Sequence, residues 1–285
     1  MGADLHIHST ESDGELTPTA IVKVAERIGL DSISITDHDC VAGVTEALLA
    51  AKNKKVTVIP GLEFSTIFKK QEVHILGYYI DISNRKLREE TSFIIEERKT
   101  RAKKIIGKLK KLGIHLSYNR VQELAGGNVI GRPHIALAMI EKGYINSVQQ
   151  AFTPDYFDNN GRAYVSRYKM SPKRAIQLIN EANGIAVVAH PGLCYGGFGL
   201  KEADLKALVN DGLEGIEVYH SAQSNEQKIS YLQIAKKFNL LITGGSDFHG
   251  QSHKEGSKIG SVVLDDKHVK KLKDYVMTKS FVERN

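Results

Sequence analysis

Cysteine is scarce in this sequence, with only Cys40 and Cys194 among 285 residues. Two isolated cysteines do not make a disulfide framework or a cysteine-rich zinc site, so a reducing cytoplasm is the expected compartment. No apolar run approaches the ~20 residues that a membrane-spanning helix needs. No basic segment leads into an apolar stretch at the N-terminus, so we expect no signal peptide. These absences favour a globular protein with no membrane partner.

Acidic residues are slightly outnumbered, with 33 Asp and Glu against 39 Lys and Arg and a net charge of +6. This excess favours anionic ligands only weakly. Much of it lies between Arg98 and Lys111. The simplest interpretation of this run is the solvated face of a helix. The alternative is a surface that attracts nucleic acid or a phosphorylated substrate.

Short β-type runs alternate with helical patterns up to about residue 80 and again after residue 168. We expect strands at 5–8, 32–36, 56–64, 73–79, 185–189, 215–219 and 240–243, and helices at 18–28, 44–52, 171–184, 201–210 and 226–238. A last strand at 259–264 and a last helix at 267–278 complete the pattern. Such alternation is typical of an α/β protein with parallel strands and helical crossovers. Seven strands are able to close into a barrel with its chemistry on one rim; an open sheet with a crevice at its switch point is the alternative.

The middle of the chain has a different pattern, because residues 85–165 are mostly helical and strongly charged. A long helix is expected at about 87–112, followed by helices at 119–125, 133–142 and 147–152. We therefore divide the chain into a barrel domain, residues 1–84 and 166–285, and an inserted helical subdomain, residues 85–165. We expect this insert to cover the rim of the barrel as a lid over the substrate.

Metal-type residues recur near the ends of the predicted strands. His6 and His8 are two apart on the first strand, so their side chains project from the same face. The others are Asp13, His38, Glu63, His74, His190, His220, Asp247 and His249. Histidine together with carboxylate suits Mn, Fe or Zn, and the absence of thiolates argues against a structural zinc site. So many donors exceed the needs of one ion, and we expect two or three divalent ions, as in sites that clamp both oxygens of a phosphoryl displacement.

The ordered motifs resemble those of the PHP (polymerase and histidinol phosphatase) family. They are Asp4-Leu-His-Ile-His-Ser, Thr36-Asp-His-Asp, Gly61-Leu-Glu-Phe-Ser, His74, Ala189-His-Pro and Ser246-Asp-Phe-His. The resemblance implies a distorted (β/α)7 barrel with a trinuclear metal centre at the C-terminal rim. It implies one ion held by His6, His8, Glu63 and Asp247, a second by Glu63, His74 and His190, and a third by Asp13, His38 and His249. Glu63 would then bridge the first two ions.

Two motifs of the insert narrow the resemblance. Gly131-Arg-Pro-His134 and Gly161-Arg-Ala-Tyr-Val165 resemble segments of the stand-alone metal-dependent phosphoesterases, one of which hydrolyses nucleoside 3′,5′-bisphosphates and trims RNA from its 5′ end. Arg132 and His134 are then candidates for binding the substrate phosphate, since arginine is able to bind a phosphate through two parallel hydrogen bonds. Tyr164, Arg167 and Lys169 follow where the insert rejoins the barrel and are further candidates for lining the pocket. His220 is expected either to support the metal ligands from behind or to contact the substrate. A loop charge and core packing are the competing interpretations of these residues.

The predicted reaction is hydrolysis of a phosphomonoester, with cleavage of RNA ends as a related activity. A hydroxide that bridges the metals would attack phosphorus. The residues expected to take part in catalysis are Asp13, His38, Glu63, Asp247 and His249. A water on the metal, His220 or His249 would protonate the leaving oxygen. We expect Asp37 and Asp39 to orient the histidines from behind.

Two other classes of protein remain possible at this stage. One is a different hydrolase, either a histidinol-phosphate phosphatase or an amidohydrolase-like enzyme, which also opens with His-x-His but usually needs a bridging lysine. The other is a non-catalytic module that binds nucleic acid. The complete donor set argues for catalysis. The physiological substrate, the metal and the oligomeric state are open, and no role is assigned to His115, His253 or His268.

Overall fold

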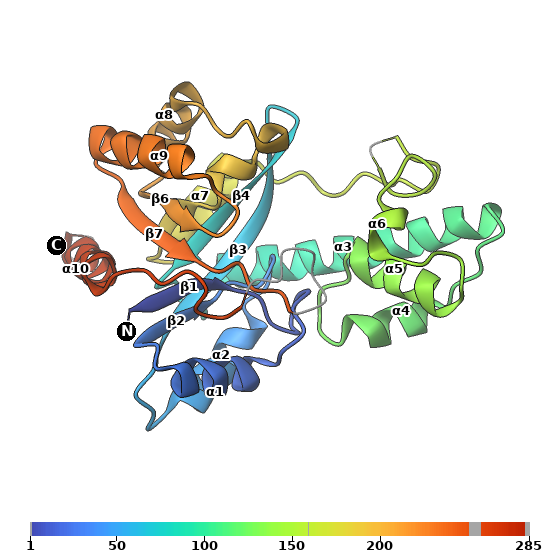
Figure 1. The fold of residues 1–285 in the computed structure, drawn as a ribbon, viewed down its shortest axis with the longest axis horizontal. Helices are drawn as coiled ribbons and strands as arrows, with labels where there is room; N and C mark the ends of the chain where they lie inside the picture. The colour runs from blue at the N-terminus through green and yellow to red at the C-terminus, as the bar shows by residue number, and fades with distance from the viewer. Residues whose placement is uncertain (1, 159, 251–257, 283–285) are drawn as a thin grey trace.

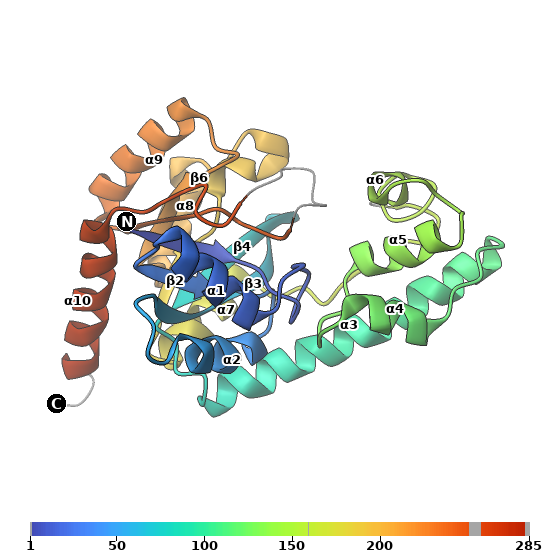
Figure 2. The same cartoon turned by 60° about the horizontal axis from the view of Figure 1, so that its bottom comes forward.

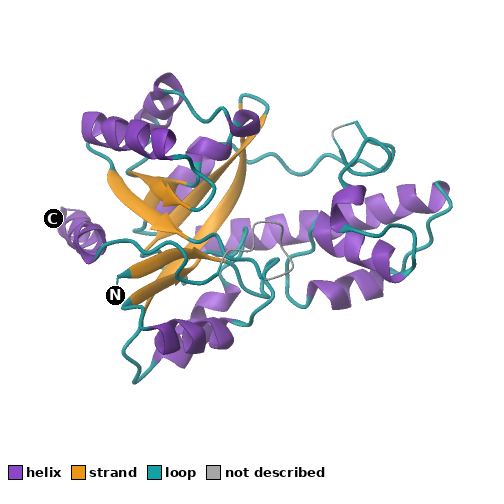
Figure 3. Cartoon of the chain, in the orientation of Figure 1, coloured by secondary structure: helices purple, strands orange, loops and turns teal. Residues whose placement is uncertain are grey.

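Seven strands form a single sheet in the order β1 to β7, nearly closed into a barrel and flanked by helices (Figures 1 and 3). The computed structural model describes residues 2–158, 160–250 and 258–282, so His253 lies outside the described residues. The strands are β1 Ala3–Ile7, β2 Ser32–Ile35, β3 Thr57–Phe68, β4 Gln71–Tyr78, β5 Ile185–Val188, β6 Gly215–His220 and β7 Leu241–Gly245. A single parallel bridge between Ile7 and Phe248 connects the two ends of the sheet. The expected barrel is therefore confirmed.

The helices that flank the barrel are α1 Pro18–Ile28, α2 Ala42–Ala51, α7 Pro172–Glu181, α8 Glu202–Asn210, α9 Asn225–Phe238 and α10 Asp266–Val282. Helix α1 shows how the sequence sets such an element. Thr17 accepts a hydrogen bond from the Ala20 N–H at its start, Pro18 occupies the first turn, and Gly29 ends it in the left-handed region. Its buried face, which includes Ile21 and Val22, packs into the cluster that covers β1 and β2.

Strand β4 corrects the expectation of parallel strands throughout, because it runs antiparallel to both β3 and β5. Strands β3 and β4 form a hairpin in which Phe68 pairs with Gln71, so Lys69 and Lys70 alone make the turn. Both lysines have positive φ, 47° and 68°, as a type I′ turn requires. The sequence lacks the Asn-Gly or Asp-Gly that usually indicates such a turn, so the hairpin was not predicted.

The expected last strand at 259–264 is wrong. This segment makes one antiparallel bridge, in which Ala3 and Leu264 exchange backbone hydrogen bonds of 2.9 and 2.7 Å. Gly260, the second residue of this segment, has a φ of 78°, and the N–H of Ser261 donates to the carbonyl of Lys258. That turn breaks the extended conformation that a strand needs.

Helices α3 Arg85–Lys111, α4 Tyr118–Ala125, α5 Arg132–Glu141 and α6 Val148–Ala151 extend away from the barrel. Figure 2 shows α3 running from beneath the barrel along the base of the other three helices. Their apolar side chains form a cluster of their own, which includes Ile105, Leu109, Val121, Ile135 and Met139. The helices expected in this part of the chain are thus confirmed.

The basic run on α3 is divided in two by this arrangement. Its lysines from Lys103 to Lys111 are exposed, whereas Arg98 and Arg101 are half-buried against the barrel side.

The two cysteines are buried and unpaired, as expected. Within the described ranges, no helix has both the length and the apolar character that crossing a bilayer would take.

Candidate metal centre

The end of β1 carries two fully buried histidines, His6 and His8. The segment after β7 lies beside them, because the Asp247 N–H donates to the His6 carbonyl at 2.8 Å and the His8 N–H donates to the Phe248 carbonyl at 2.9 Å. Gly245 permits this approach, since a Cβ there would lie 2.4 Å from the His6 Cβ. These contacts join the first and last strands of the barrel at the end where His6 and His8 lie.

Glu63 is the central acid of the site. It lies on β3 with only 1% of its surface exposed. Its Oε1 lies 3.0 Å from Nδ1 of His74 and 3.1 Å from Nε2 of His190, and its Oε2 lies 3.0 Å from Nδ1 of His38. Burial opposes the ionisation of Glu63, but the surrounding imidazoles outweigh it and hold its pKa well below the ordinary value.

Two carboxylates face the outer nitrogens of His6 and His8. Nε2 of His6 lies 3.2 Å from Oδ1 of Asp247 and 3.5 Å from Oε1 of Glu63. Nε2 of His8 lies 3.2 Å from the same Asp247 oxygen and 3.3 Å from Oε2 of Glu63. The four residues expected from the resemblance to surround one ion are therefore adjacent in the structure.

A second group of donors lies on the other side of His8. One donor atom from each of His8, Asp13, His38 and His249 lies within 4.8 Å of the others. Asp13 Oδ1 is 3.5 Å from Nε2 of His249 and 3.7 Å from Nδ1 of His8. Burial and the proximity of His8 lower the pKa of His249 to about 4, so this ring is neutral at pH 7 and able to act as a ligand.

The donors fit a metal on grounds of hydrogen bonding as well as distance. Among the metal-type residues that the structure describes, five buried nitrogens and one buried oxygen make no hydrogen bond: His6 Nε2, His8 Nδ1 and Nε2, His38 Nδ1, His190 Nδ1 and Asp13 Oδ1. Buried polar atoms without partners cost free energy unless something else satisfies them. Imidazole nitrogens that face carboxylate oxygens form the donor set that first-row divalent ions prefer.

Glu217 is a member of the site that the sequence interpretation missed. Its Oε1 lies 3.0 Å from Nδ1 of His6, and its Oε2 accepts the His190 N–H at 2.7 Å. Burial opposes the ionisation of Glu217, but the adjacent His6 lowers its pKa below the ordinary value. An acidic residue inside the otherwise apolar run of β6 was the available signal, since buried charges are rarely unpaired.

Asp37 and Asp39 do not contact the histidines as we expected. Asp37 accepts hydrogen bonds from the Ser9 N–H at 2.7 Å and from the hydroxyls of Ser9 and Ser12 at 2.6 and 2.5 Å. Asp39 accepts from the Ser65 N–H at 2.9 Å and from Arg98 Nε at 3.1 Å. Asp37 thus orders the loop after β1, and Asp39 joins the barrel to α3.

His220 is placed behind the site rather than in an open pocket. It is fully buried, its Nε2 lies 3.3 Å from Oδ2 of Asp247, and its Nδ1 accepts the Ala222 N–H at 3.2 Å. In the neutral ring, the proton therefore sits on Nε2 and points at Asp247. Of the two roles expected for His220, this geometry favours orientation of Asp247 over contact with substrate.

The other predicted substrate residues lie on or near the insert. Nη1 of Arg132 donates to the Phe157 carbonyl at 3.0 Å, and its guanidinium lies 5.0 Å from the Phe152 ring centroid. His134 is buried, and its Nδ1 accepts the Gly131 N–H at 3.1 Å. Tyr164 is half-buried. The insert therefore holds these groups in place by its own contacts.

A cluster of arginines, Arg98, Arg101, Arg132 and Arg167, lies beside the metal-type residues. The sequence suggested substrate contact for Arg132 and Arg167, and a surface for anions was the alternative for the basic run that includes Arg98 and Arg101. Burial and the neighbouring arginines lower the pKa of Arg101 to about 10. Arg167 pairs at 2.9 Å with Glu72, which in turn lies 3.0 Å from Nε2 of His74. Concentrated positive charge next to a carboxylate-rich centre is suited to an anionic ligand.

The chain is similar in sequence to a known protein family and to characterised enzymes. A family model described as "PHP domain" matches residues 4–211. A 5′-3′ exoribonuclease of Haemophilus influenzae is 35% identical over 250 residues, which cover 86% of this chain and 89% of that protein. A 3′,5′-nucleoside bisphosphate phosphatase of Chromobacterium violaceum is 32% identical over 247 residues, 86% of each protein.

A solved structure is similar over almost the whole chain. It comes from Bifidobacterium adolescentis, is described as a candidate metal-dependent phosphoesterase, and has a TM-score of 0.86 at 30% identity over 95% of both chains. The fold is that of the metal-dependent phosphoesterases, and the protein is a metal-dependent hydrolase that acts on phosphoric esters. The chain belongs to the PHP domain family.

Proposed function

We propose that this enzyme hydrolyses phosphomonoesters of nucleotides, with nucleoside 3′,5′-bisphosphates or RNA 5′ ends as substrates. The observation that carries the proposal is the position of Glu63, whose two oxygens contact His38, His74 and His190. A single carboxylate shared among several imidazoles is suited to a bridge between metal ions. The adjacent arginine cluster supplies charge for a second anionic group of the substrate.

The proposed ligand sets follow the adjacency of the donors. His6, His8, Glu63 and Asp247 would hold one ion, and Glu63, His74 and His190 a second. Asp13, His38 and His249 would hold a third, so two to three divalent ions, Mn, Fe or Zn, would bind. Within the described residues, His190 also groups with His6 and Asp247, and His38 with Glu63 and His74. Neighbouring sets therefore share donors.

The protein groups around the ions have separate tasks in this proposal. When bound, divalent ions lower the pKa of water and neutralise charge on the phosphoryl oxygens. Glu217 and His220 hold His6 and Asp247 in orientation through hydrogen bonds of 3.0 and 3.3 Å. Arg132 and His134 would bind the phosphate from the insert side. Excluding water from the rim would strengthen each of these interactions.

The insert gives a reason for a nucleotide rather than a bare sugar phosphate. We propose that residues 85–165 form a lid and that residues 1–84 and 166–285 form the catalytic barrel. Two relatives named above act on nucleoside 3′,5′-bisphosphate or RNA. Both substrates carry more than one phosphate and a nucleoside, which a centre flanked by arginines and an insert is able to bind together.

A substrate screen tests the proposal. Protein loaded with Mn is assayed against adenosine 3′,5′-bisphosphate, a 5′-phosphorylated oligoribonucleotide, histidinol phosphate and ribose 5-phosphate, with released phosphate and mononucleotides measured separately. We expect the highest kcat/KM with one of the first two substrates. The control is the His8→Ala variant, which should lose all activities together. A preference for histidinol phosphate or for the sugar phosphate would refute the nucleotide assignment.

A further inference from the structure

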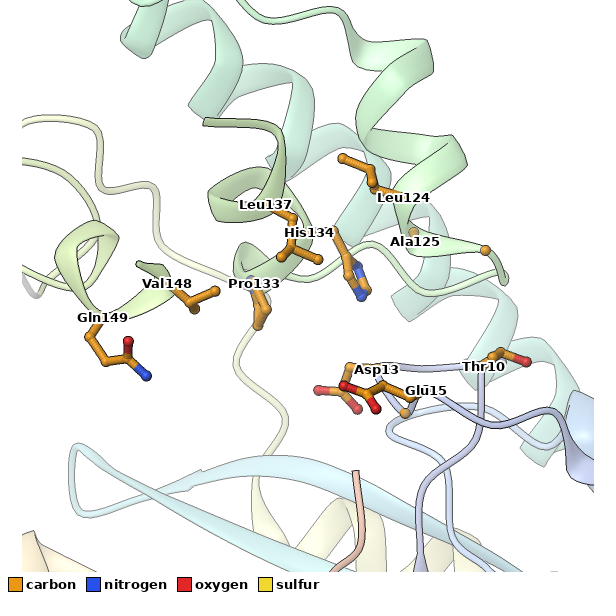
Figure 4. A pocket seen from close by; sticks show the side chains of 12 residues that line it. Thr10, Asp13, Glu15, Leu124, Ala125, Pro133, His134, Leu137, Val148 and Gln149 are labelled. Carbon is orange, nitrogen blue, oxygen red and sulfur yellow. The ribbon is translucent and has the colours of Figure 1, made fainter. Parts of the chain in front are cut away.

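A cavity of about 370 Å³ lies between the loop after β1 and the helical insert (Figure 4). The loop supplies Thr10, Asp13, Gly14 and Glu15 to its lining, and the insert supplies Leu124, Ala125, Gly126, Pro133, His134, Leu137, Val148 and Gln149. Its volume lies at the lower end of the ~300–1,000 Å³ typical of small-molecule pockets. The cavity is therefore large enough for part of a substrate, and it opens beside Asp13.

The two sides of this cavity differ in chemistry. Leu124, Pro133, Leu137 and Val148 give the insert side an apolar surface, whereas Asp13 stands on the opposite side (Figure 4). Leu137 keeps 37% of its surface exposed although it is apolar. An exposed apolar wall that faces a candidate metal ligand is suited to a flat, weakly polar group joined to a phosphate.

Contacts between the loop and the insert hold the two sides of the cavity at this separation. Nδ2 of Asn128 donates to Oε2 of Glu11 at 2.9 Å. Gly127 lies directly against the loop, and a Cβ there would be 2.1 Å from the Thr10 carbonyl oxygen. No other residue permits this close approach of two backbones. The shape of the cavity is therefore fixed by specific contacts between the insert and the barrel.

His134 adds a directional donor to the cavity. Its Nδ1 accepts the Gly131 N–H at 3.1 Å, so the neutral ring carries its proton on Nε2. Figure 4 shows the ring extending from α5 into the space between the insert and Asp13. The ring therefore lies at the boundary between the apolar wall and Asp13, where the organic part of a substrate would meet its phosphate.

We propose that this cavity is the specificity site for the nucleoside of the substrate, with the base against Leu124, Leu137 and Val148. Gln149 supplies an amide for the polar edge of the base, and His134 binds on the sugar–phosphate side. The inference rests on the proposed function, because it needs a phosphoester whose phosphate lies at the metal centre. The residues proposed to bind the nucleoside belong to none of the proposed metal ligand sets. Asp13 is the one residue of the cavity lining that is also a proposed metal ligand.

The experiment compares adenosine 3′,5′-bisphosphate with its abasic analogue, in which hydrogen replaces the base. The variant is Leu137→Gln, and the matched control is Leu49→Gln on α2, whose side chain is 70% exposed away from the cavity lining. Calorimetry measures the Kd of both ligands for proteins loaded with a divalent ion that supports no turnover, since the chain has no tryptophan to report binding. Turnover of both ligands is measured separately with Mn-loaded protein.

We expect the wild type and Leu49→Gln to bind the base-carrying ligand more tightly than the abasic one. In Leu137→Gln this preference should fall about tenfold, the loss typical of one apolar contact in a specificity pocket. Equal binding of the two ligands by the wild type, or an unchanged preference in Leu137→Gln, would overturn the inference. If the preference collapses as expected while neither ligand is hydrolysed, the cavity stands and the proposed function fails.

Discussion

Glu217 lies with its Oε1 3.0 Å from Nδ1 of His6, and both side chains are fully buried. This contact keeps a proton on Nδ1, so Nε2, which faces Glu63 and Asp247, is the nitrogen that would bind a metal. The relationship matters because a carboxylate behind a histidine fixes its tautomer and raises its basicity as a ligand.

The Glu217→Gln variant tests that role. We expect metal affinity to fall by about 10–100-fold, the usual cost of losing such a support, because the neutral amide polarises His6 less. Metal content after dialysis and thermal unfolding of the metal-free protein are the two measurements. Glu214→Gln is the control, since Glu214 directly precedes β6 and pairs with Lys279 at 2.8 Å. Unchanged metal content in Glu217→Gln would contradict the assignment.

Replacing Asp247 by Ala should remove activity and leave the fold. Its Oδ1 faces the ring nitrogens of both His6 and His8 at 3.2 Å, so its loss should cost more than the loss of a supporting group, at least about a hundredfold in kcat/KM. Circular dichroism and metal analysis accompany the assay. Asp265→Ala, an exposed acid that pairs with Lys267, is the control. Full activity of metal-replete Asp247→Ala, or clearly fewer than two ions per wild-type chain, would count against the proposed centre.

Metal uptake should release protons. Burial disfavours the charged rings, but Asp247 and Glu63 beside His8, and Glu63 and Glu72 beside His74, raise the pKa of both histidines to about 10 in the metal-free protein. Below pH 10 both rings therefore hold a proton that a metal must displace. Affinity should rise as the pH rises toward 10 and fall as it drops.

Calorimetry in two buffers of different ionisation enthalpy counts the protons released on Mn binding at pH 7.5. The His74→Ala variant should release fewer protons than the wild type. His115→Ala, which removes an exposed ring far along the insert, should release the same number. Metal binding without proton release in the wild type would show that these rings are already neutral.

The pair formed by Arg98 and Asp39 should stabilise the junction between barrel and insert. Asp39 is 1% exposed and Arg98 16% exposed, so Arg98→Ala leaves a buried carboxylate without its partner. Removing one member of such a pair typically costs about 3 kcal/mol. Chemical denaturation of Arg98→Ala measures the loss in the free energy of unfolding.

Adding Asp39→Asn to Arg98→Ala should restore part of that loss, because the amide needs no countercharge and still accepts the Ser65 N–H. The control on the same helix is Arg85→Ala, whose 89% exposed side chain pairs with Glu89 in water and should change stability by less than about 1 kcal/mol. Equal destabilisation by Arg98→Ala and Arg85→Ala would refute the structural role of the pair.

Most secondary structure was predictable because its signals are local. Helix α1 begins and ends where Thr17, Pro18 and Gly29 indicate, and six of the seven strands follow the expected direction. The exception is β4, which follows a turn made by Lys69 and Lys70. Both residues have positive φ, which lysine does not predict. The failed strand at 259–264 has the opposite cause, since Gly260 was read as part of an apolar run rather than as a turn.

The candidate metal ligands from His6 to His249, and their order along the chain, followed from the sequence, because residue type and the ends of strands are local features. The sequence also identified the family, which the comparisons confirmed. Only the tertiary structure decided that Glu63 contacts His38 as well as His74 and His190, and that Glu217 stands behind His6. The cavity beside Asp13 likewise exists only where Gly127 of the insert meets the loop after β1. These contacts join residues up to 211 positions apart; they arise from closure of the barrel and docking of the insert, which no local pattern encodes.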